Sequence, residues 1–125
     1  MYEVSVKCNF IAQHYMVSED WTIKNEKHSN HYQLELVVAG KTLDQNGYLI
    51  DIMYLENIMD RLVERYRDRT LNDFDEFKDI NPSIENFSHI VCDSIAAEIK
   101  FSNIHSITLR IWENQIAWAS YTKEL

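Results

Sequence analysis

The side chains best suited to chemistry are histidines near the ends of predicted strands. His14 continues one face of an alternating stretch, and His28 and His31 lie at the start of the next one. Imidazole nitrogen is a good zinc ligand, and a catalytic zinc site uses three protein ligands and one open position. A strand-end histidine is more often a surface or hydrogen-bonded residue, so the histidines alone leave both interpretations open.

One acidic residue has an unusual position. Glu113 follows Ile107, Leu109 and Ile111 at two-residue spacing, so it belongs to the apolar face of its predicted strand. A carboxylate in a dry pocket can accept two neighbouring N–H groups of a ligand. The alternative is a strand-end glutamate in water.

The two cysteines need no chemical role. Cys8 lies inside a predicted strand and Cys92 inside a predicted helix, where each serves as a small buried hydrophobe. Two cysteines form no disulfide framework, so a reducing compartment is the default expectation.

Alternating and helical periodicities predict the elements that position these residues. Residues 2–15 and 30–39 alternate with period two and predict strands, and two closing strands are predicted around 107–111 and 116–120, joined by a turn at Asn114-Gln115. Residues 16–27 and 67–80 are predicted loops.

The middle of the chain changes to helical spacing. Residues 52–66 predict an amphipathic helix with Asp51 as its cap. Asn81-Pro82-Ser83 predicts the start of a second helix, with Asn81 as the cap and Pro82 in the first turn. The order strand, strand, helix, helix, strand, strand predicts an α+β fold with a mostly antiparallel sheet.

Length and composition exclude several classes of protein. The 125 residues predict one domain, 1–125, and the net charge of −8 argues against a nucleic-acid partner. No apolar run approaches the roughly 18 residues that a membrane span requires. Met1 is followed at once by a strand pattern without a basic or apolar leader, so we expect no signal peptide and a cytoplasmic location.

Six short motifs follow one another along nearly the whole chain. They are Phe10-Ile11-Ala12-Gln13-His14, His28-Ser29-Asn30-His31-Tyr32, Gly47-Tyr48-Leu49-Ile50-Asp51, Asn81-Pro82-Ser83-Ile84-Glu85-Asn86, Ile111-Trp112-Glu113-Asn114 and Ala119-Ser120-Tyr121. In order and spacing they resemble motifs of the 6-pyruvoyl/6-carboxytetrahydropterin synthase family. Each motif is weak alone, but the six together are fairly specific.

This resemblance implies a T-fold: a four-stranded antiparallel sheet with two helices on one face. It also implies assembly through strand edges into an oligomeric barrel, a trimer or a hexamer, which would pair otherwise open sheet edges. In the resembled family the active sites lie between subunits and hold zinc on three histidines and a pterin anchored by a glutamate.

The implied zinc ligands are His14, His28 and Asn30, so asparagine stands where the family has its third histidine. An asparagine oxygen is a poor zinc ligand. His31 could replace it only through a bulge at Ser29-Asn30, because strand alternation otherwise points His31 away from His28.

The implied catalytic base is altered too. The family's cysteine position falls near Lys24, and its Asp-His pair falls on Arg67-Asp68 or, after a one-residue slip, on Asp68-Arg69. Glu26, two residues before His28, and Asp68 are the candidate replacements, since desolvation can raise the pKa of a carboxylate toward that of a useful base.

The pterin-binding positions are better retained. Glu113 matches the pterin anchor, and Ser83 matches a threonine whose hydroxyl could contact the ring, although Ser83 could equally be only part of a helix cap.

Two functions follow from these matches and departures. The first is a lyase-type synthase that acts on a dihydropterin triphosphate with zinc assistance and altered catalytic residues. The second is a non-catalytic pterin- or purine-binding, or structural, T-fold oligomer. The retained His14, His28 and Glu113 favour the first, and the altered Asn30 and missing cysteine favour the second.

Overall fold

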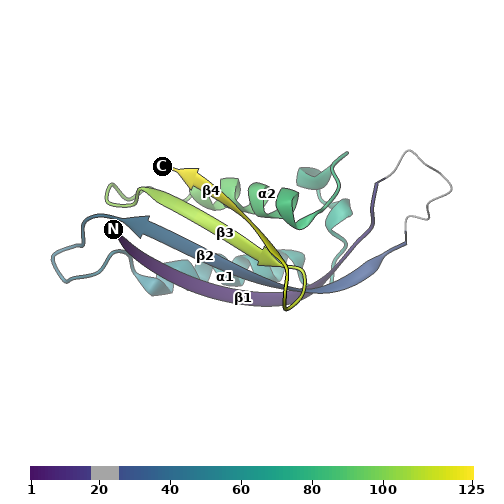
Figure 1. Ribbon diagram of the computed structural model, residues 1–125, viewed down its shortest axis with the longest axis horizontal. Coiled ribbons are helices and arrows are strands. Elements are labelled where there is room, and N and C mark those ends of the chain that lie inside the picture. Colours follow the sequence, from purple (N-terminus) through teal and green to yellow (C-terminus); the bar gives the residue numbers. More distant parts are fainter. Residues whose placement is uncertain (18–25) are drawn as a thin grey trace.

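The structure is a computed structural model that describes residues 1–17 and 26–125. Its sheet has four antiparallel strands in the order β1 (Tyr2–His14), β2 (His28–Gly40), β3 (Ser106–Trp112) and β4 (Trp118–Glu124). Two helices, α1 (Ile52–Tyr66) and α2 (Ile84–Ala96), cover one face of this sheet (Figure 1). The predicted element order and the α+β class are confirmed.

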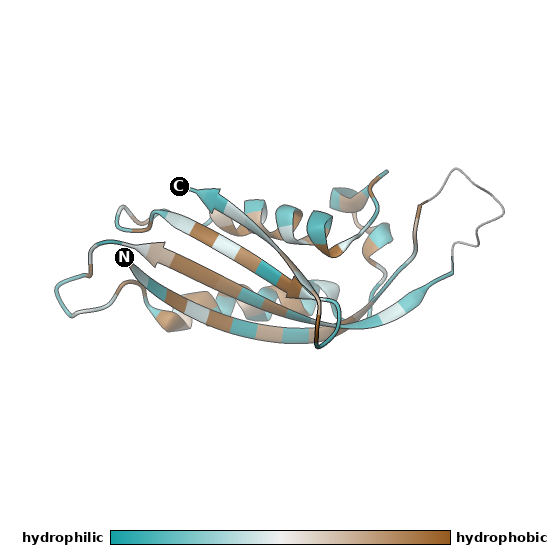
Figure 2. Cartoon of the chain, viewed as in Figure 1, coloured by the Kyte–Doolittle hydropathy of each residue, from teal (hydrophilic) through white to brown (hydrophobic). Residues whose placement is uncertain are grey.

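The strands form because their apolar residues alternate. Inward positions in the middle of the sheet pack under the helices and are fully or almost fully buried, whereas Val4, Val6 and Cys8 near the start of β1 are partly buried. The outward positions are mostly polar, and Figure 2 shows this change of hydropathy along β1, β2 and β3. The buried inward residues are Phe10, Ala12, Tyr32, Leu34, Leu36, Val38, Ile107, Leu109 and Ile111. The core therefore lies in a single layer between the sheet and the two helices.

The strands have unequal lengths, so the paired residues 10–14 of β1 and 28–32 of β2 project beyond β3 as a two-stranded ribbon. β1 pairs with β2 over its full length, from Tyr2 opposite Gly40 to His14 opposite His28. β3 pairs only with residues 33–39 of β2, so the far ends of β1 and β2 extend past β3 (Figure 1). The pairing is continuous through Ser29, so the bulge that would turn His31 toward His28 is not present.

The helix starts agree only in part with the sequence prediction. Asp51 caps α1 as expected, since its carboxylate accepts a hydrogen bond of 2.9 Å from the Met53 backbone N–H. The prediction for α2 is wrong: Ser83 is the cap, its hydroxyl accepts from the Asn86 N–H, and Pro82 precedes the helix. The reason is that the Asn81 side chain accepts a hydrogen bond from the Val17 backbone instead.

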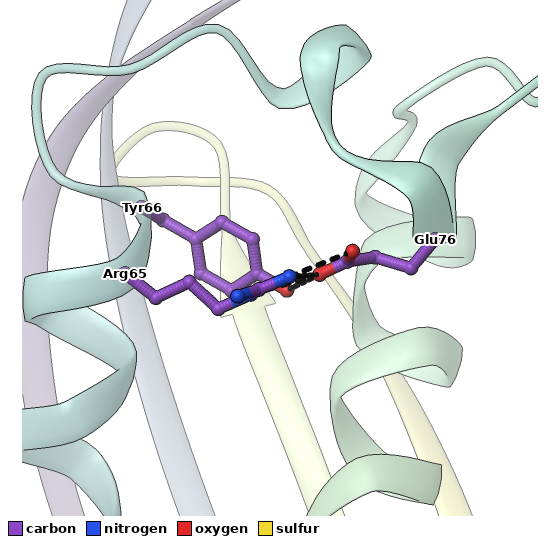
Figure 3. Close-up of polar contacts among 3 residues, drawn as sticks. All are labelled: Arg65, Tyr66 and Glu76. Carbon is purple, nitrogen blue, oxygen red and sulfur yellow. Dashed lines mark hydrogen bonds and ion pairs between the residues drawn. The ribbon is translucent and has the colours of Figure 1, made fainter.

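The connection between the helices contains two short 3-10 helices, η1 (Leu71–Asp73) and η2 (Asp75–Phe77). Glu76 fixes it to the end of α1, because its carboxylate accepts hydrogen bonds of 2.8–2.9 Å from the Arg65 guanidinium and 2.8 Å from the Tyr66 hydroxyl (Figure 3). The guanidinium also lies 4.8 Å from the centre of the Phe74 ring. Arg65, Tyr66 and Glu76 are called the Glu76 cluster below.

The same connection runs along the outer edge of β1. The Asp68 N–H donates to the Ile11 carbonyl at 2.7 Å, and the Gln13 N–H donates to the Arg69 carbonyl at 2.8 Å. Just beyond the strand, the Asn72 amide makes two hydrogen bonds to the backbone of Tyr15, of 3.0 and 2.9 Å. The end of β1 that carries His14 is therefore held from two sides, by β2 and by this connection.

Within residues 1–17 and 26–125, neither helix has the length and apolar character needed to cross a membrane.

The Glu76 cluster makes stability depend on acid. Burial alone would raise the pKa of Glu76, but backbone and side-chain hydrogen bonds and the Arg65 charge outweigh it and hold this pKa below its ordinary value of 4.5. The stability that this carboxylate contributes is present above 4.5 and is lost as the pH falls through the lower folded-state pKa. We expect melting temperatures between about pH 6 and pH 3 to fall more for the wild type than for Glu76→Gln.

A truncation tests the same cluster at neutral pH. Glu76→Ala removes the acceptor of the largely buried Tyr66 hydroxyl and should lower the free energy of unfolding by about 1–3 kcal/mol. Urea denaturation measures this loss, and Glu64→Ala on the exposed side of α1 is the matched control. Equal stabilities for the two variants would mean that the Glu76 cluster does not hold the connection.

Candidate functional site

A cavity of about 400 Å³ lies where the projecting ends of β1 and β2 meet the start of α2. It is lined by His14, Met16, Glu26, His28, Asn81, Pro82, Ser83 and Glu113. These residues come from four separate parts of the chain, and five of the seven candidate site residues are among them. A sixth, Asn30, contacts the cavity-lining Glu113.

His14 is the most constrained of these groups. Its Nδ1 atom lies 3.1 Å from the Tyr32 hydroxyl, and its ring centre lies 6.0 Å from that of His28. Burial lowers the pKa of His14; Glu113 opposes this shift and His28 adds to it. His14 is therefore a neutral imidazole at neutral pH, and its Nε2 atom remains for a ligand.

Tyr32 is a site residue that the sequence prediction treated only as core. Burial and the nearby Glu113 raise its pKa, so its hydroxyl keeps its proton. Its ring is 1% exposed, which fixes the hydroxyl beneath His14. The spacing of two residues from Asn30 and four from His28 was the available indication, because it puts all three on one face of β2.

Glu113 lies immediately after β3, on the face that carries the helices. Its Oε1 atom accepts a hydrogen bond of 3.3 Å from the Asn30 side-chain amide, and its backbone N–H donates to the Ala117 carbonyl. The position agrees with the prediction from the spacing of Ile107, Leu109 and Ile111. The carboxylate is thus available to the cavity from the sheet side.

Ser83 and Glu26 lie on other walls of the cavity. The Ser83 hydroxyl oxygen accepts from the Asn86 N–H, so its own proton can still be donated to a ligand. Glu26 is exposed and lies two residues before His28, the first residue of β2. Asn81, which the sequence prediction assigned only to a cap, is a lining residue that orders Val17 at the same time.

The seventh candidate, Asp68, lies elsewhere. Asp68 lines a separate hollow with Arg69, Thr70, Asp73 and Phe74, on the outer edge of β1, and has a left-handed φ of 60°. Within one chain, Asp68 does not line the cavity that contains His14, which is called the His14 cavity below. Lys24, the position that matches the family's cysteine, lies outside the described residues.

The outward face of the ribbon holds His31. Its Nε2 atom lies 2.9 Å from Asn9 Oδ1, and it lines a hollow with Trp112 on the side of the sheet away from the helices. His31 therefore does not replace the missing third histidine.

Neither cysteine is a reactive group of this site. Burial raises the pKa of Cys8 to about 12 and that of Cys92 to about 11, so both remain protonated thiols at neutral pH. Cys92 is a buried core residue as predicted, whereas Cys8 is only partly buried and packs against the edge of the core.

Comparison with known proteins places the chain in a family. The sequence model of the family described as 6-pyruvoyl tetrahydropterin synthase matches residues 3–124. The chain belongs to the 6-pyruvoyl tetrahydropterin synthase family. A curated relative, the dihydroneopterin monophosphate aldolase of Pyrococcus furiosus, is 27% identical over 107 residues, which are 86% of this chain and 85% of that protein.

Solved structures confirm the T-fold. The 6-pyruvoyl tetrahydropterin synthase of Plasmodium falciparum superposes with a TM-score of 0.80 at 18% identity, over 99% of this chain and 98% of that one. The Plasmodium vivax synthase, in a form in which a glutamate named as its catalytic residue is replaced by cysteine, gives 0.81 at 12% identity, over 99% and 98%. At these identities the likeness establishes the fold.

The zinc that the family implies fits this donor set poorly. Among residues 1–17 and 26–125, no three His, Cys, Asp or Glu side chains are placed to hold one metal ion together. His14 and His28 supply two imidazoles, but the third position is Asn30, whose amide nitrogen is turned to Glu113. Amide oxygens suit harder cations than zinc. The described donor set therefore gives no support for a metal-assisted step.

This misfit predicts the effect of restoring the third imidazole. Asn30→His should complete a three-histidine set and bind zinc at least about tenfold more tightly than the wild type, a difference of about 1.4 kcal/mol. Competition titration against a chromophoric chelator measures it. Ser29→His is the matched control, because position 29 faces the other side of the ribbon. Equal affinities for all three proteins would show that position 30 does not face a metal site.

Proposed function

We propose that this chain is a lyase that binds a phosphorylated dihydroneopterin in the His14 cavity and cleaves or rearranges its side chain. The observation that carries the proposal is the meeting of His14, His28, Glu26, Ser83 and Glu113 around one cavity. Family membership and the similarity to an aldolase of dihydroneopterin monophosphate support the ligand class.

The ring would be held from the sheet side. A pterin presents a ring N–H and a 2-amino group side by side, and the Glu113 carboxylate can accept both in a bidentate, charge-assisted pair. The Ser83 hydroxyl can donate to a ring acceptor from the opposite wall. Together these groups select a flat heterocycle with a donor edge.

The chemistry would begin with proton removal. Glu26 is the proposed base: in an aldol cleavage it accepts the proton of the side-chain hydroxyl next to the bond that breaks. The electrons of that carbon–carbon bond move into the dihydropterin ring, the outer fragment leaves as an aldehyde, and the proton then returns to the remaining side-chain carbon. The neutral His14 imidazole can hydrogen-bond and orient the side-chain oxygens.

A catalytic glutamate has a parallel within the T-fold. The Plasmodium vivax synthase has a glutamate named as its catalytic residue. This chain carries Glu26 beside the cavity, two residues after Lys24, the position that matches the family's cysteine. That parallel supports Glu26 as the base over Cys8 and Cys92, neither of which lines the cavity.

Asp68 and the oligomer belong to the same proposal. We infer a trimer or hexamer joined through the edge of β4 and the part of the β1 edge before Ile11, neither of which is paired on its outer side within the described residues. In such an assembly Asp68, remote from the cavity of its own chain, would act in the site of a neighbouring copy as a second acid–base group or orienter.

A non-catalytic pterin-binding oligomer is the second candidate. The Asn30–Glu113 hydrogen bond favours this candidate. The amide of Asn30 occupies the position of a metal ligand of the family, while the Glu113 carboxylate can still accept hydrogen bonds from a pterin.

Turnover decides between the two candidates. We expect the purified protein to convert 7,8-dihydroneopterin monophosphate or triphosphate, and product identification by mass spectrometry separates carbon–carbon cleavage from loss of triphosphate. Glu26→Gln should lower kcat/KM by about 10²–10⁴-fold with pterin binding retained. Binding without conversion of either ester would establish the non-catalytic candidate.

Ring recognition is tested without turnover. Glu113→Ala should weaken neopterin binding by about 10–100-fold, because it removes a charge-assisted pair of hydrogen bonds. Isothermal titration calorimetry measures the loss, with Glu124→Ala at the far end of β4 as control. Unchanged affinity in Glu113→Ala would remove the assignment of the pterin anchor.

A further inference from the structure

We propose that Asn30 is a positioning residue whose side-chain amide orients the Glu113 carboxylate for a ligand that presents two adjacent N–H groups. This inference rests on the function proposed above, in which Glu113 anchors the ring. It assigns Asn30 a recognition role in place of the metal-ligand role that its position implies.

The contact itself defines the direction of the hydrogen bond. Asn30 Nδ2 lies 3.3 Å from Glu113 Oε1. An ionised carboxylate has only acceptors, so the amide nitrogen, and not the amide oxygen, must face it. One acceptor site of Oε1 is then used, and Oε2 stays free for the ligand.

The two partners differ in how firmly the backbone holds them. Asn30 is paired with Ala12 inside the continuous β1–β2 ladder, which fixes its short side chain over the cavity side of the ribbon. Glu113 lies one residue past the end of β3 and is exposed. A free glutamate side chain must give up rotamer entropy when it binds a ligand. A fixed donor reduces that cost by ordering the carboxylate beforehand.

The surrounding charges make an amide well suited to this position. The carboxylates of Glu26 and Glu113 both line the cavity. An aspartate at position 30 would repel Glu113, whereas the neutral amide donates to it without adding charge.

A pair of ring probes tests the orientation directly. Neopterin and its 2-oxo lumazine analogue differ in whether position 2 carries the amino donor that Glu113 is proposed to accept. We expect Asn30→Ala to weaken neopterin binding about three- to tenfold, and lumazine-analogue binding less than about twofold, so that the preference between the rings falls. Calorimetric titration gives both affinities.

Three further variants separate positioning from packing. Asn30→Asp keeps the size of the side chain, but it cannot donate to a carboxylate and its charge repels Glu113. It should therefore bind neopterin less well than Asn30→Ala. In a Glu113→Ala background, Asn30→Ala should cause no further loss, because its effect passes through Glu113. Ser29→Ala, on the other side of the ribbon, should bind as the wild type does, and thermal melting confirms that each variant is folded.

The outcomes distinguish this inference from the function on which it rests. If the wild type prefers neopterin and Asn30→Ala keeps that preference, or if Asn30→Ala weakens both rings equally, the positioning role is wrong while the proposed pterin site stands. A further loss in the Glu113→Ala background would also overturn it. If the wild type binds neither ring, the proposed pterin function itself fails.

Discussion

The antiparallel register between β1 and β2 is the constraint on which the candidate site depends. It sets His14 opposite His28 and Ala12 opposite Asn30. Since side chains alternate along a strand, this register puts His28, Asn30 and Tyr32 on the face that carries the helices and leaves His31 on the other. A slip of β2 by one residue would exchange its two faces, which would turn His28 and Asn30 away from the helices and bring His31 to their side. The buried Phe10, Tyr32 and Leu34 in the same strands oppose such a slip.

The connection between α1 and α2 is the second support. The Glu76 cluster fixes it to α1. The Asp68 N–H, the Arg69 carbonyl and the Asn72 side chain make hydrogen bonds that fix the end of β1 to it. It then leads into Asn81, Pro82 and Ser83, which close one wall of the cavity. Residues that the sequence suggests are only a charged loop thus determine where His14 lies relative to α2.

Local periodicity was sufficient to predict most of the fold and part of the site. The first three strands, the exact extent of α1 and the inward position of Glu113 follow from spacings within one element, and the Asp51 cap follows from its place before α1. The last strand was predicted around 116–120 but runs from Trp118 to Glu124. The other failures concern contacts between distant residues. Asn81 was predicted as a helix cap, but its acceptor is used by Val17, 64 residues earlier. The Asn30–Glu113 contact spans 83 residues and no local pattern reports it. Whether Asp68 serves a neighbouring subunit also depends on an arrangement that one chain's sequence does not encode locally.

The raised pKa values of the two thiols have a practical consequence for chemical labelling. Both cysteines of the chain are held protonated, Cys8 with a pKa of about 12 and Cys92 with a pKa of about 11. Maleimides and disulfide reagents attack the thiolate, so both native cysteines react slowly near neutral pH. A cysteine introduced at exposed position 26 would be alkylated well ahead of them. The wild-type background therefore accepts a fluorophore or spin label at the rim of the cavity without prior removal of its own cysteines.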